Sequence, residues 1–218
     1  MTPDFDRAAT LAAETLIKYN ICSSPVSPLP ILKKMKGVIV VSFAEISDSI
    51  DMDRSELISM FNVNQDAVTS VHVDDGKLRY VVAYNQRLPF YMLQRGLSRE
   101  LGHIMLGHDG SRPAHVRYAE AVCFAYHLLC PRALIHAMQE SGAKLTIETL
   151  GNLTGCYERC LSGMRKTPAT HVPAELNKKV AEQFAEYIDN FLDYHAVIAK
   201  DDDSALADFG TYMDGYEE

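Results

Sequence analysis

The sequence has no excess of basic residues, which proteins that bind nucleic acid usually carry. Its 218 residues include 21 Lys and Arg against 29 Asp and Glu, a formal net charge of −8. Seven of these acids lie in residues 201–218, which contain no Lys or Arg, so the rest of the chain holds 21 bases against 22 acids. Contacts to phosphate supply much of the affinity for nucleic acid and depend on Lys and Arg. We therefore do not expect this chain to bind nucleic acid.

The sequence also lacks the features of exported, membrane-spanning and disulfide-bonded proteins. Asp4 and Asp6 precede the first apolar stretch, whereas an export signal starts with a cationic segment. The longest apolar runs, such as 38–41 and 121–126, are far shorter than the ~20 residues of a membrane helix. The five cysteines are odd in number and show no C-x-x-C spacing, which argues against a disulfide framework or a zinc ribbon. We expect a cytoplasmic protein that does not enter the membrane.

The first half of the chain predicts a small sheet between helical segments. Residues 4–19 carry apolar side chains at helical spacing, and Asn20 follows as a stop. Residues 38–43 predict a buried strand, and residues 67–73 and 77–84 predict a hairpin around an Asp-Asp-Gly turn. Shorter helices are expected up to Met35, just before Gly37, and near residues 55–61. The fold class that we expect is α+β with about three strands.

Residues after Pro89 are expected to be almost wholly helical. Apolar residues recur at every fourth position from Leu93 to Met105 and form one stripe on a helix that Gly107 ends. Further helices are expected at about 115–130, from Pro131, at 146–161 and at 173–199.

We expect a domain over residues 1–165 that includes a possible helix pair at 145–161, a long helix within 166–200, and a disordered acidic tail at 201–218. The long helix carries a heptad-like apolar seam over fewer than four heptads. Packing on its own domain is therefore favoured over a homodimer through residues 173–199.

Residues with chemical potential are concentrated in two of these predicted helices. The first contains Arg99-Glu100-Leu101-Gly102-His103 and is followed by His108; the second begins E-A-V-C-F-A at Glu120 and reaches L-L-C-P at residues 128–131. Positions i and i+4 project from one helix face, so two ligands at this spacing can share a metal ion while position i+1 reaches its bound water. Gly102 weakens a helix by ~1 kcal/mol, which predicts that another element approaches closely there.

This pair of motifs, in this order and after a hairpin, resembles the ImmA/IrrE-type metallopeptidase family. The resemblance covers residues 11–161 and implies a zincin-like fold, with a small sheet packed against the motif helix. In that family H-E-x-G-H supplies two zinc-binding histidines and a general base, and the second helix supplies a carboxylate ligand. Carried onto this chain, His103 matches the second ligand, Glu100 the general base and Glu120 the third ligand.

The sequence departs from the family at the first ligand, where Arg99 stands, and also at Val122 and Cys130. Arginine has no lone pair to donate and stays protonated, so it cannot bind zinc. Two matched ligands remain, whereas a catalytic zinc usually has three from the protein. A divalent ion 4 Å from a guanidinium would be repelled by about 8 kcal/mol at an effective dielectric of 20. We therefore expect a pseudo-site without a cofactor, in which Arg99 pairs with Glu120, and with Glu100 as a second partner, in place of zinc.

An altered zinc site is the alternative, because Cys123 and His127 share a helix face with Glu120. The active form would be a zinc-dependent endopeptidase with these residues: His103, Glu120 and either Cys123 or His127 as ligands, with Glu100 as general base. Buried cysteine is more often a small core residue, which favours the pseudo-site. His108 lies five residues after His103, so we expect it on another face, as a helix-end residue.

The resemblance also implies a biological role. Active family members cleave or release a partner transcriptional repressor, often a helix-turn-helix protein of a prophage or mobile element. We expect this chain to be a non-catalytic regulatory descendant that still binds such a repressor. Direct DNA binding through residues 145–161 is the hypothesis that we rank last.

Overall fold

The computed structural model describes residues 1–50, 66–74, 76–156, 161 and 169–198. The helix predicted near 55–61 and the acidic tail at 201–218 lie outside these residues. The chain divides into two compact units: residues 1–4 with 27–125, and residues 5–26 with 126–218. The sequence predicts boundaries at residues 165 and 200 instead. The observed division brings the first helix together with the helices of the C-terminal half, and this pairing is not visible in the linear pattern.

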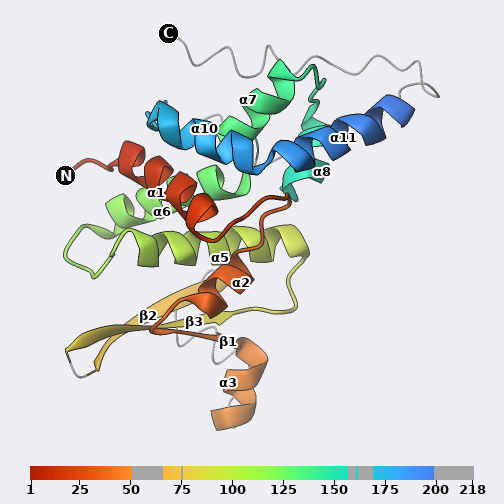
Figure 1. Cartoon of the computed structure of the whole chain (residues 1–218). Coiled ribbons are helices and arrows are strands. Elements are labelled where there is room, and N and C mark those ends of the chain that lie inside the picture. The colour runs from red at the N-terminus through yellow and green to blue at the C-terminus, as the bar shows by residue number, and fades with distance from the viewer. Residues whose placement is uncertain (51–65, 75, 157–160, 162–168, 199–218) are drawn as a thin grey trace. The chain divides into compact units, whose positions relative to one another are not determined.

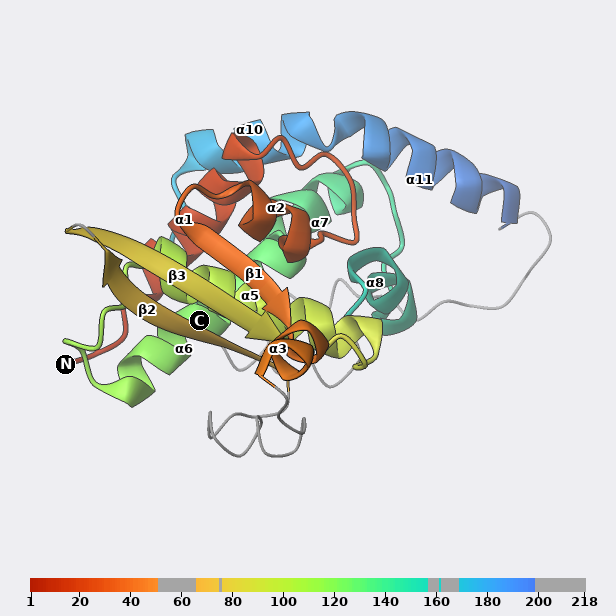
Figure 2. The ribbon, with the colours of Figure 1, turned by 90° about the horizontal axis from the view of Figure 1, so that it is seen from below.

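The first unit contains a three-stranded sheet, as predicted, and the sheet is mixed. The strands are β1 (Val38–Ser42), β2 (Ala67–Asp74) and β3 (Lys77–Tyr84), in the order β1-β3-β2 (Figure 2). β2 and β3 pair antiparallel and form the predicted hairpin, whereas β1 runs parallel to β3. The chain turns between β2 and β3 at Gly76, whose φ of 72° is one that glycine adopts without strain.

The strand predicted over 38–43 ends one residue earlier, because a capping box begins a helix there. The Ser42 amide donates to the Glu45 carboxylate at 2.6 Å, and the Glu45 amide donates to the Ser42 hydroxyl at 3.2 Å. This reciprocal pair satisfies amides that the first helical turn leaves open. Helix α3 (Phe43–Ile50) follows, and Phe43 is fully buried against one face of the sheet with Ala83, Val41 and Val68.

Two long helices of this unit carry the motif residues. α5 (Phe90–Met105) packs against β2 and β3, and α2 (Pro28–Lys34) packs against β1 and α5 (Figure 1). Of the predicted apolar stripe on α5, Leu97 and Leu101 are fully buried, whereas Leu93 and Met105 at its two ends are half-buried. The chain leaves α5 at Gly107, whose φ is 68°, and re-enters a helix at α6 (Ala114–Leu129).

Gly102 is where α5 meets α6, which confirms the close approach predicted for this residue. A Cβ at this position would lie 3.0 Å from both the Ala121 carbonyl oxygen and a ring carbon of Phe124. We expect Gly102→Ala to lower the free energy of unfolding by about 1–3 kcal/mol, because overpacking between two helix backbones outweighs the ~1 kcal/mol gain in helix propensity. Urea unfolding measures this change, and a more stable variant would contradict the packing.

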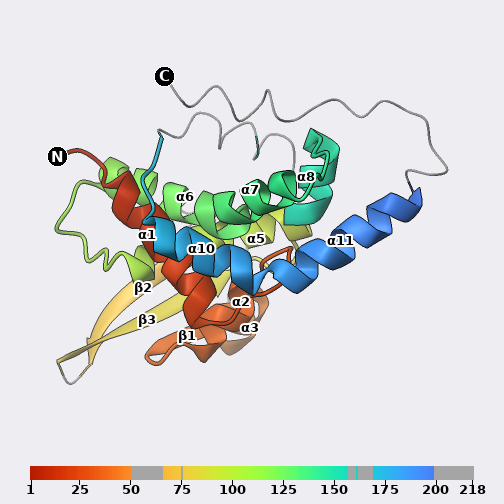
Figure 3. The ribbon, with the colours of Figure 1, turned by 45° about the horizontal axis from the view of Figure 1, so that its top comes forward.

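The second unit is helical and surrounds α10 (Ala174–Gln183). α10 packs against α1 (Phe5–Lys18) and α7 (Arg132–Glu140) (Figure 3). Its Gln183 side chain donates to the carbonyl oxygens of Leu16 and Ile21. These bonds join the end of α10 to the end of α1.

The helix predicted over 173–199 is two helices, α10 and α11 (Ala185–Ile198), separated at Phe184. The Phe184 amide is shared between the carbonyl oxygens of Val180 and Ala181, which tightens the last turn of α10. Val180 and Phe184 of the predicted seam are buried, so its first part is covered, whereas Tyr194 near its other end is 64% exposed. Residues 157–160 of the helix predicted at 146–161 lie outside the described residues. The described part contains α8 (Ile147–Thr154), which ends at Gly155 because the chain turns left-handed there, with φ of 64°.

Residues 114–140, which contain α6 and α7, are long and apolar enough to cross a membrane by length and composition alone. The uninterrupted apolar runs predict no membrane helix, because polar residues interrupt this stretch. Core helices of soluble proteins share this composition, and several side chains here are fully buried, among them Val116, Phe124 and Leu128. The composition of this stretch is therefore only weak evidence for or against a membrane span.

Candidate functional site

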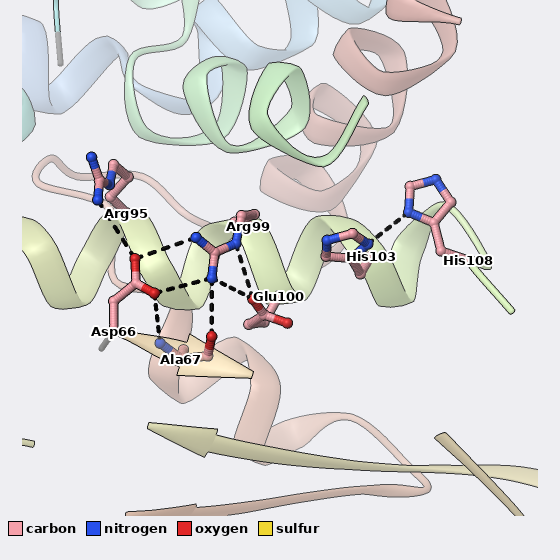
Figure 4. Close-up of polar contacts among 7 residues, drawn as sticks. All are labelled: Asp66, Ala67, Arg95, Arg99, Glu100, His103 and His108. Carbon is pink, nitrogen blue, oxygen red and sulfur yellow. Dashed lines mark hydrogen bonds and ion pairs between the residues drawn. The ribbon is translucent and has the colours of Figure 1, made fainter. Parts of the chain in front are cut away.

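Arg99 points into the first unit, and all three nitrogen atoms of its guanidinium group donate hydrogen bonds (Figure 4). Nη1 and Nη2 donate to the two carboxylate oxygens of Asp66, at 3.3 and 3.1 Å. Nε and Nη2 donate to Glu100 Oε1, at 3.0 and 2.8 Å, and Nη2 also reaches the Ala67 carbonyl at 3.0 Å. Only 9% of Arg99 is exposed. The guanidinium is thus a buried cation held between two carboxylates.

Asp66 is held in this position by the start of β2 and by a glycine of α5. Its carboxylate accepts from the Ala67 amide at 2.9 Å, and its carbonyl accepts from the Asn85 amide at 2.8 Å. A Cβ on Gly96 would lie 3.0 Å from Asp66 Cβ, so only glycine lets the aspartate approach the helix this closely. Sequence reasoning missed Asp66, because it lies 33 residues from Arg99 in a segment with no motif.

The electrostatics of the cluster favour a charged Arg99. Burial lowers the pKa of Arg99, but Glu100 and Asp66 outweigh burial and raise it above its ordinary value. Burial raises the pKa of Glu100, and the Arg99 guanidinium acts in the opposite direction. Arg95 adds a second, half-exposed cation 3.5 Å from Asp66. The two buried carboxylates therefore depend on Arg99 for their main counter-charge.

The predicted ion pair between Arg99 and Glu120 is not formed, whereas the predicted contact with Glu100 is. Glu120, on α6, is fully buried and is bound by other groups. Its carboxylate lies 2.8 Å from Arg112 Nη1 and 3.0 Å from His108 Nε2, and Oε1 accepts from the Asp4 amide at 2.7 Å. The prediction failed because Glu120 pairs with a different cation, Arg112, which lies in the short loop after α5. Arg99 pairs instead with Asp66.

His108 was expected on a different helix face from His103, and this was wrong. The helix ends before His108, because Gly107 takes a left-handed conformation, so helical periodicity does not apply to it. The His108 amide donates to the His103 carbonyl at 3.0 Å, and the two Nδ1 atoms lie 2.8 Å apart (Figure 4). His108 is 5% exposed. It therefore connects His103 to Glu120.

Hydrogen bonding assigns a protonation pattern to the chain Glu120–His108–His103. The carboxylate of Glu120 can only accept, so His108 Nε2 carries a proton and donates it. His108 Nδ1 then has a lone pair, and His103 Nδ1 must donate to it. Burial is the largest cause that lowers the pKa of both rings, to about 3 for His103, so both stay neutral near pH 7. One lone pair, on His103 Nε2, is left over.

These contacts do not fit a bound zinc ion. Within the described residues, no three His, Cys, Asp or Glu side chains are arranged to hold a metal. Both ring nitrogens of His108 are already used, and the Glu120 carboxylate is bound by Arg112, His108 and the Asp4 amide. A metal ion could bind the Nε2 lone pair of His103, but it would have to displace Arg112 from Glu120 to gain a second ligand.

Cys123 and His127, the two substitute ligands of the altered zinc site, are both buried. Cys123 is 1% exposed within α6 and is not in a disulfide. His127, in the second unit, has its Nε2 3.0 Å from the Thr170 hydroxyl. Burial first, and then Arg132, lowers the pKa of His127 to about 4. These surroundings favour a neutral core histidine over a ligand.

We expect His127 to lower the free energy of unfolding as the pH falls. Its folded pKa of about 4 lies below the unfolded value of about 6.5, so the unfolded state binds the proton first and stability is lost from pH 6.5 downward. Between pH 7 and 5 this residue should cost about 1–2 kcal/mol. Urea unfolding of the parent and of His127→Gln at both pH values isolates the effect as a difference. Equal pH dependence in the two proteins would refute it.

No family model, no curated protein and no solved structure matches this chain. The fold is α+β, with a small three-stranded mixed sheet packed against helices and a helical C-terminal half. What the chain does must therefore be inferred from the contacts above and from its motifs.

Proposed function

We propose that this protein is a non-catalytic regulatory relative of the ImmA/IrrE-type metallopeptidases, with a zincin-like fold and an ion pair in place of zinc. One observation carries the proposal: Arg99 stands at the position of the first zinc ligand, and its guanidinium is buried and paired with Asp66 and Glu100. A buried arginine in this position removes a ligand and places a permanent positive charge beside the remaining motif residues.

The same ion pair would disable the general base. In the family pattern this glutamate takes a proton from a metal-bound water. Here Glu100 Oε1 accepts two hydrogen bonds from Arg99, at 3.0 and 2.8 Å. Burial raises the pKa of Glu100, and the guanidinium opposes this rise. The two hydrogen bonds also occupy the Oε1 lone pairs, which are then not available to take a proton from water. Loss of the ligand and engagement of the base act together against hydrolysis.

The resemblance extends the proposal to a partner. A chain that has lost cleavage but kept the fold would bind a helix-turn-helix repressor of a phage or mobile element in the cytoplasm and alter its activity without cutting it. Among the described strands, β2 lies at the edge of the sheet, where its outer backbone groups can pair with an added strand. Pull-down of a candidate repressor by the intact chain, with the repressor recovered at full length, is the expected result.

Zinc content tests the central claim. Protein purified from zinc-replete cells should contain zinc far below stoichiometric amounts by elemental analysis. Arg99→His combined with Asp66→Asn should take up about one zinc ion per chain, because it restores the first ligand, which completes a set of three, and removes an unpaired carboxylate. Arg99→Gln with Asp66→Asn is the matched control and should stay free of zinc. Stoichiometric zinc in the parent, lost on His103→Ala, would overturn the proposal.

A second candidate is an active zinc peptidase with an altered ligand set. One observation favours it: His108 lies within hydrogen-bond distance of both His103 and Glu120, and His103 keeps one lone pair. This candidate requires zinc to displace Arg112 from Glu120. Peptide hydrolysis by the parent that a chelator stops and added zinc restores would support it, with Glu100→Gln as the inactive control.

A further inference from the structure

Residues 1–4, which we call the strap, belong to the first unit and lie against Glu120 and Arg112. The Asp4 amide donates to Glu120 Oε1 at 2.7 Å, and the Thr2 carbonyl accepts from Arg112 Nη2 at 3.5 Å. Arg112 Nε also lies 3.3 Å from the Met1 sulfur. A carboxylate and a guanidinium thus hold a donor and an acceptor of one main chain, two residues apart.

The two hydrogen bonds use main-chain atoms of the strap and not the side chains of Thr2 and Asp4. Pro3 lies between these residues and disfavours the helical conformation in Thr2. The strap is accordingly not helical, and α1 begins only at Phe5. Another non-helical segment with different side chains can therefore make the same two contacts, provided that its amide at the position of Asp4 carries a hydrogen.

The burial of the two sides of this contact differs. Glu120 is fully buried, and a buried carboxylate that loses a hydrogen-bond donor is destabilised, so the site requires a donor at this position. The strap itself lies at the surface, where Met1, Thr2 and Asp4 are exposed and Met1 is 79% exposed. The side chain of Arg112 is 24% exposed. The strap can therefore leave without disturbing the core, whereas Glu120 stays in place and needs a replacement donor.

We propose that the strap is the internal occupant of a peptide-binding site at Glu120 and Arg112, and that a partner protein binds there by displacing it with a segment of its own. A short segment of the same chain has an effective concentration in the millimolar range, so it competes with peptides that bind this weakly. The apparent affinity for the partner falls in proportion to the fraction of molecules in which the site is open. That the partner is a repressor rests on the proposed function.

A synthetic peptide of residues 1–5, with its ends blocked by an acetyl and an amide group, is the probe. Asp4→Pro in the full chain removes the amide hydrogen that binds Glu120, whereas the matched control Asp4→Ala loses the same carboxylate and keeps that hydrogen. In NMR titrations, Asp4→Pro should bind the probe with a dissociation constant on the order of 1 mM and at least about 10-fold more tightly than Asp4→Ala. Equal affinity of the two variants, or no binding to Asp4→Pro, would overturn the proposal.

Two comparisons in the Asp4→Pro protein locate the bound probe. A probe with proline in place of its aspartate lacks the amide hydrogen and should bind at least about 10-fold more weakly. Adding Arg112→Met should weaken the original probe by about 2- to 10-fold, because its carbonyl loses a donor, whereas adding Arg87→Met, at an exposed position, should not. Unchanged binding in either comparison would place the probe elsewhere and refute the proposal. The comparison of the two probes stands even if Arg112→Met fails to fold.

The outcome for this site is separate from the outcome for the proposed function. The probe is a segment of this chain, so its titration involves neither zinc nor a repressor. Stoichiometric zinc in the parent would overturn the proposed function and leave the competition between strap and probe intact. Failure of the probe to bind would overturn the peptide site and leave the zinc result unchanged.

Discussion

Arg99→Met is expected to lower the free energy of unfolding by about 3–5 kcal/mol, the largest effect of any single substitution considered for this chain. Methionine keeps most of the aliphatic length of arginine but removes the cation. Asp66 and Glu100 would then be two buried carboxylates without their main counter-charge, and the Ala67 carbonyl would lose a donor. Breaking a buried ion pair from one side is costly, because the remaining charge stays desolvated.

Three further variants separate this cause from a simple loss of packing. Arg87→Met removes an exposed arginine and should change stability by less than about 0.5 kcal/mol. Arg99→Met combined with Asp66→Asn should recover part of the loss, because the second change removes one unpaired charge. Arg99→Lys should fall between parent and Arg99→Met, since an ammonium cannot form the fork. A loss below 1 kcal/mol for Arg99→Met in urea unfolding would mean that the cluster is not the buried ion pair described.

Glu120→Gln is expected to cost about 2–3 kcal/mol, the second largest effect. Glu120 accepts from Arg112, His108 and the Asp4 amide, and all three partners donate. A glutamine has one amide group that can only donate, so at least one partner would face a donor in a fully buried position. Arg112 is 24% exposed at its side chain, and water can satisfy it in part, which keeps the cost below that of Arg99→Met.

The same variant tests the protonation pattern of the two histidines. In the parent, Glu120 holds the proton on His108 Nε2, and this places the proton of His103 on Nδ1. Nitrogen NMR shifts of both rings should report these tautomers in the parent and a mixture in Glu120→Gln. Glu140→Gln removes a carboxylate that is exposed and should change neither the shifts nor the stability. Unchanged tautomers in Glu120→Gln would show that Glu120 does not orient the relay.

Local pattern predicted most secondary structure, and it failed where the chain leaves a regular element. The hairpin, the stripe on α5 and the stop before α7 at Pro131 follow from turn residues, period and the missing amide of proline, and each depends on neighbours a few residues away. His108 was misplaced because helical spacing was extended past Gly107, where the helix has ended. The S-x-x-E pattern of Ser42 and Glu45 is typical of a capping box and would have predicted this helix start, but it was missed.

By itself, the sequence determined that an arginine stands where the H-E-x-G-H pattern that it resembles has its first histidine, since the identity of Arg99 needs no coordinates. Only the tertiary structure decided which carboxylates neutralise it. Asp66 reaches Arg99 because a strand begins there and Gly96 leaves room beside it, while Arg112 and His108 hold Glu120. Spacing along a helix determines which residues share a face. The partner of a buried charge depends on which segment packs against that face, and such packing joins residues that are far apart in the chain.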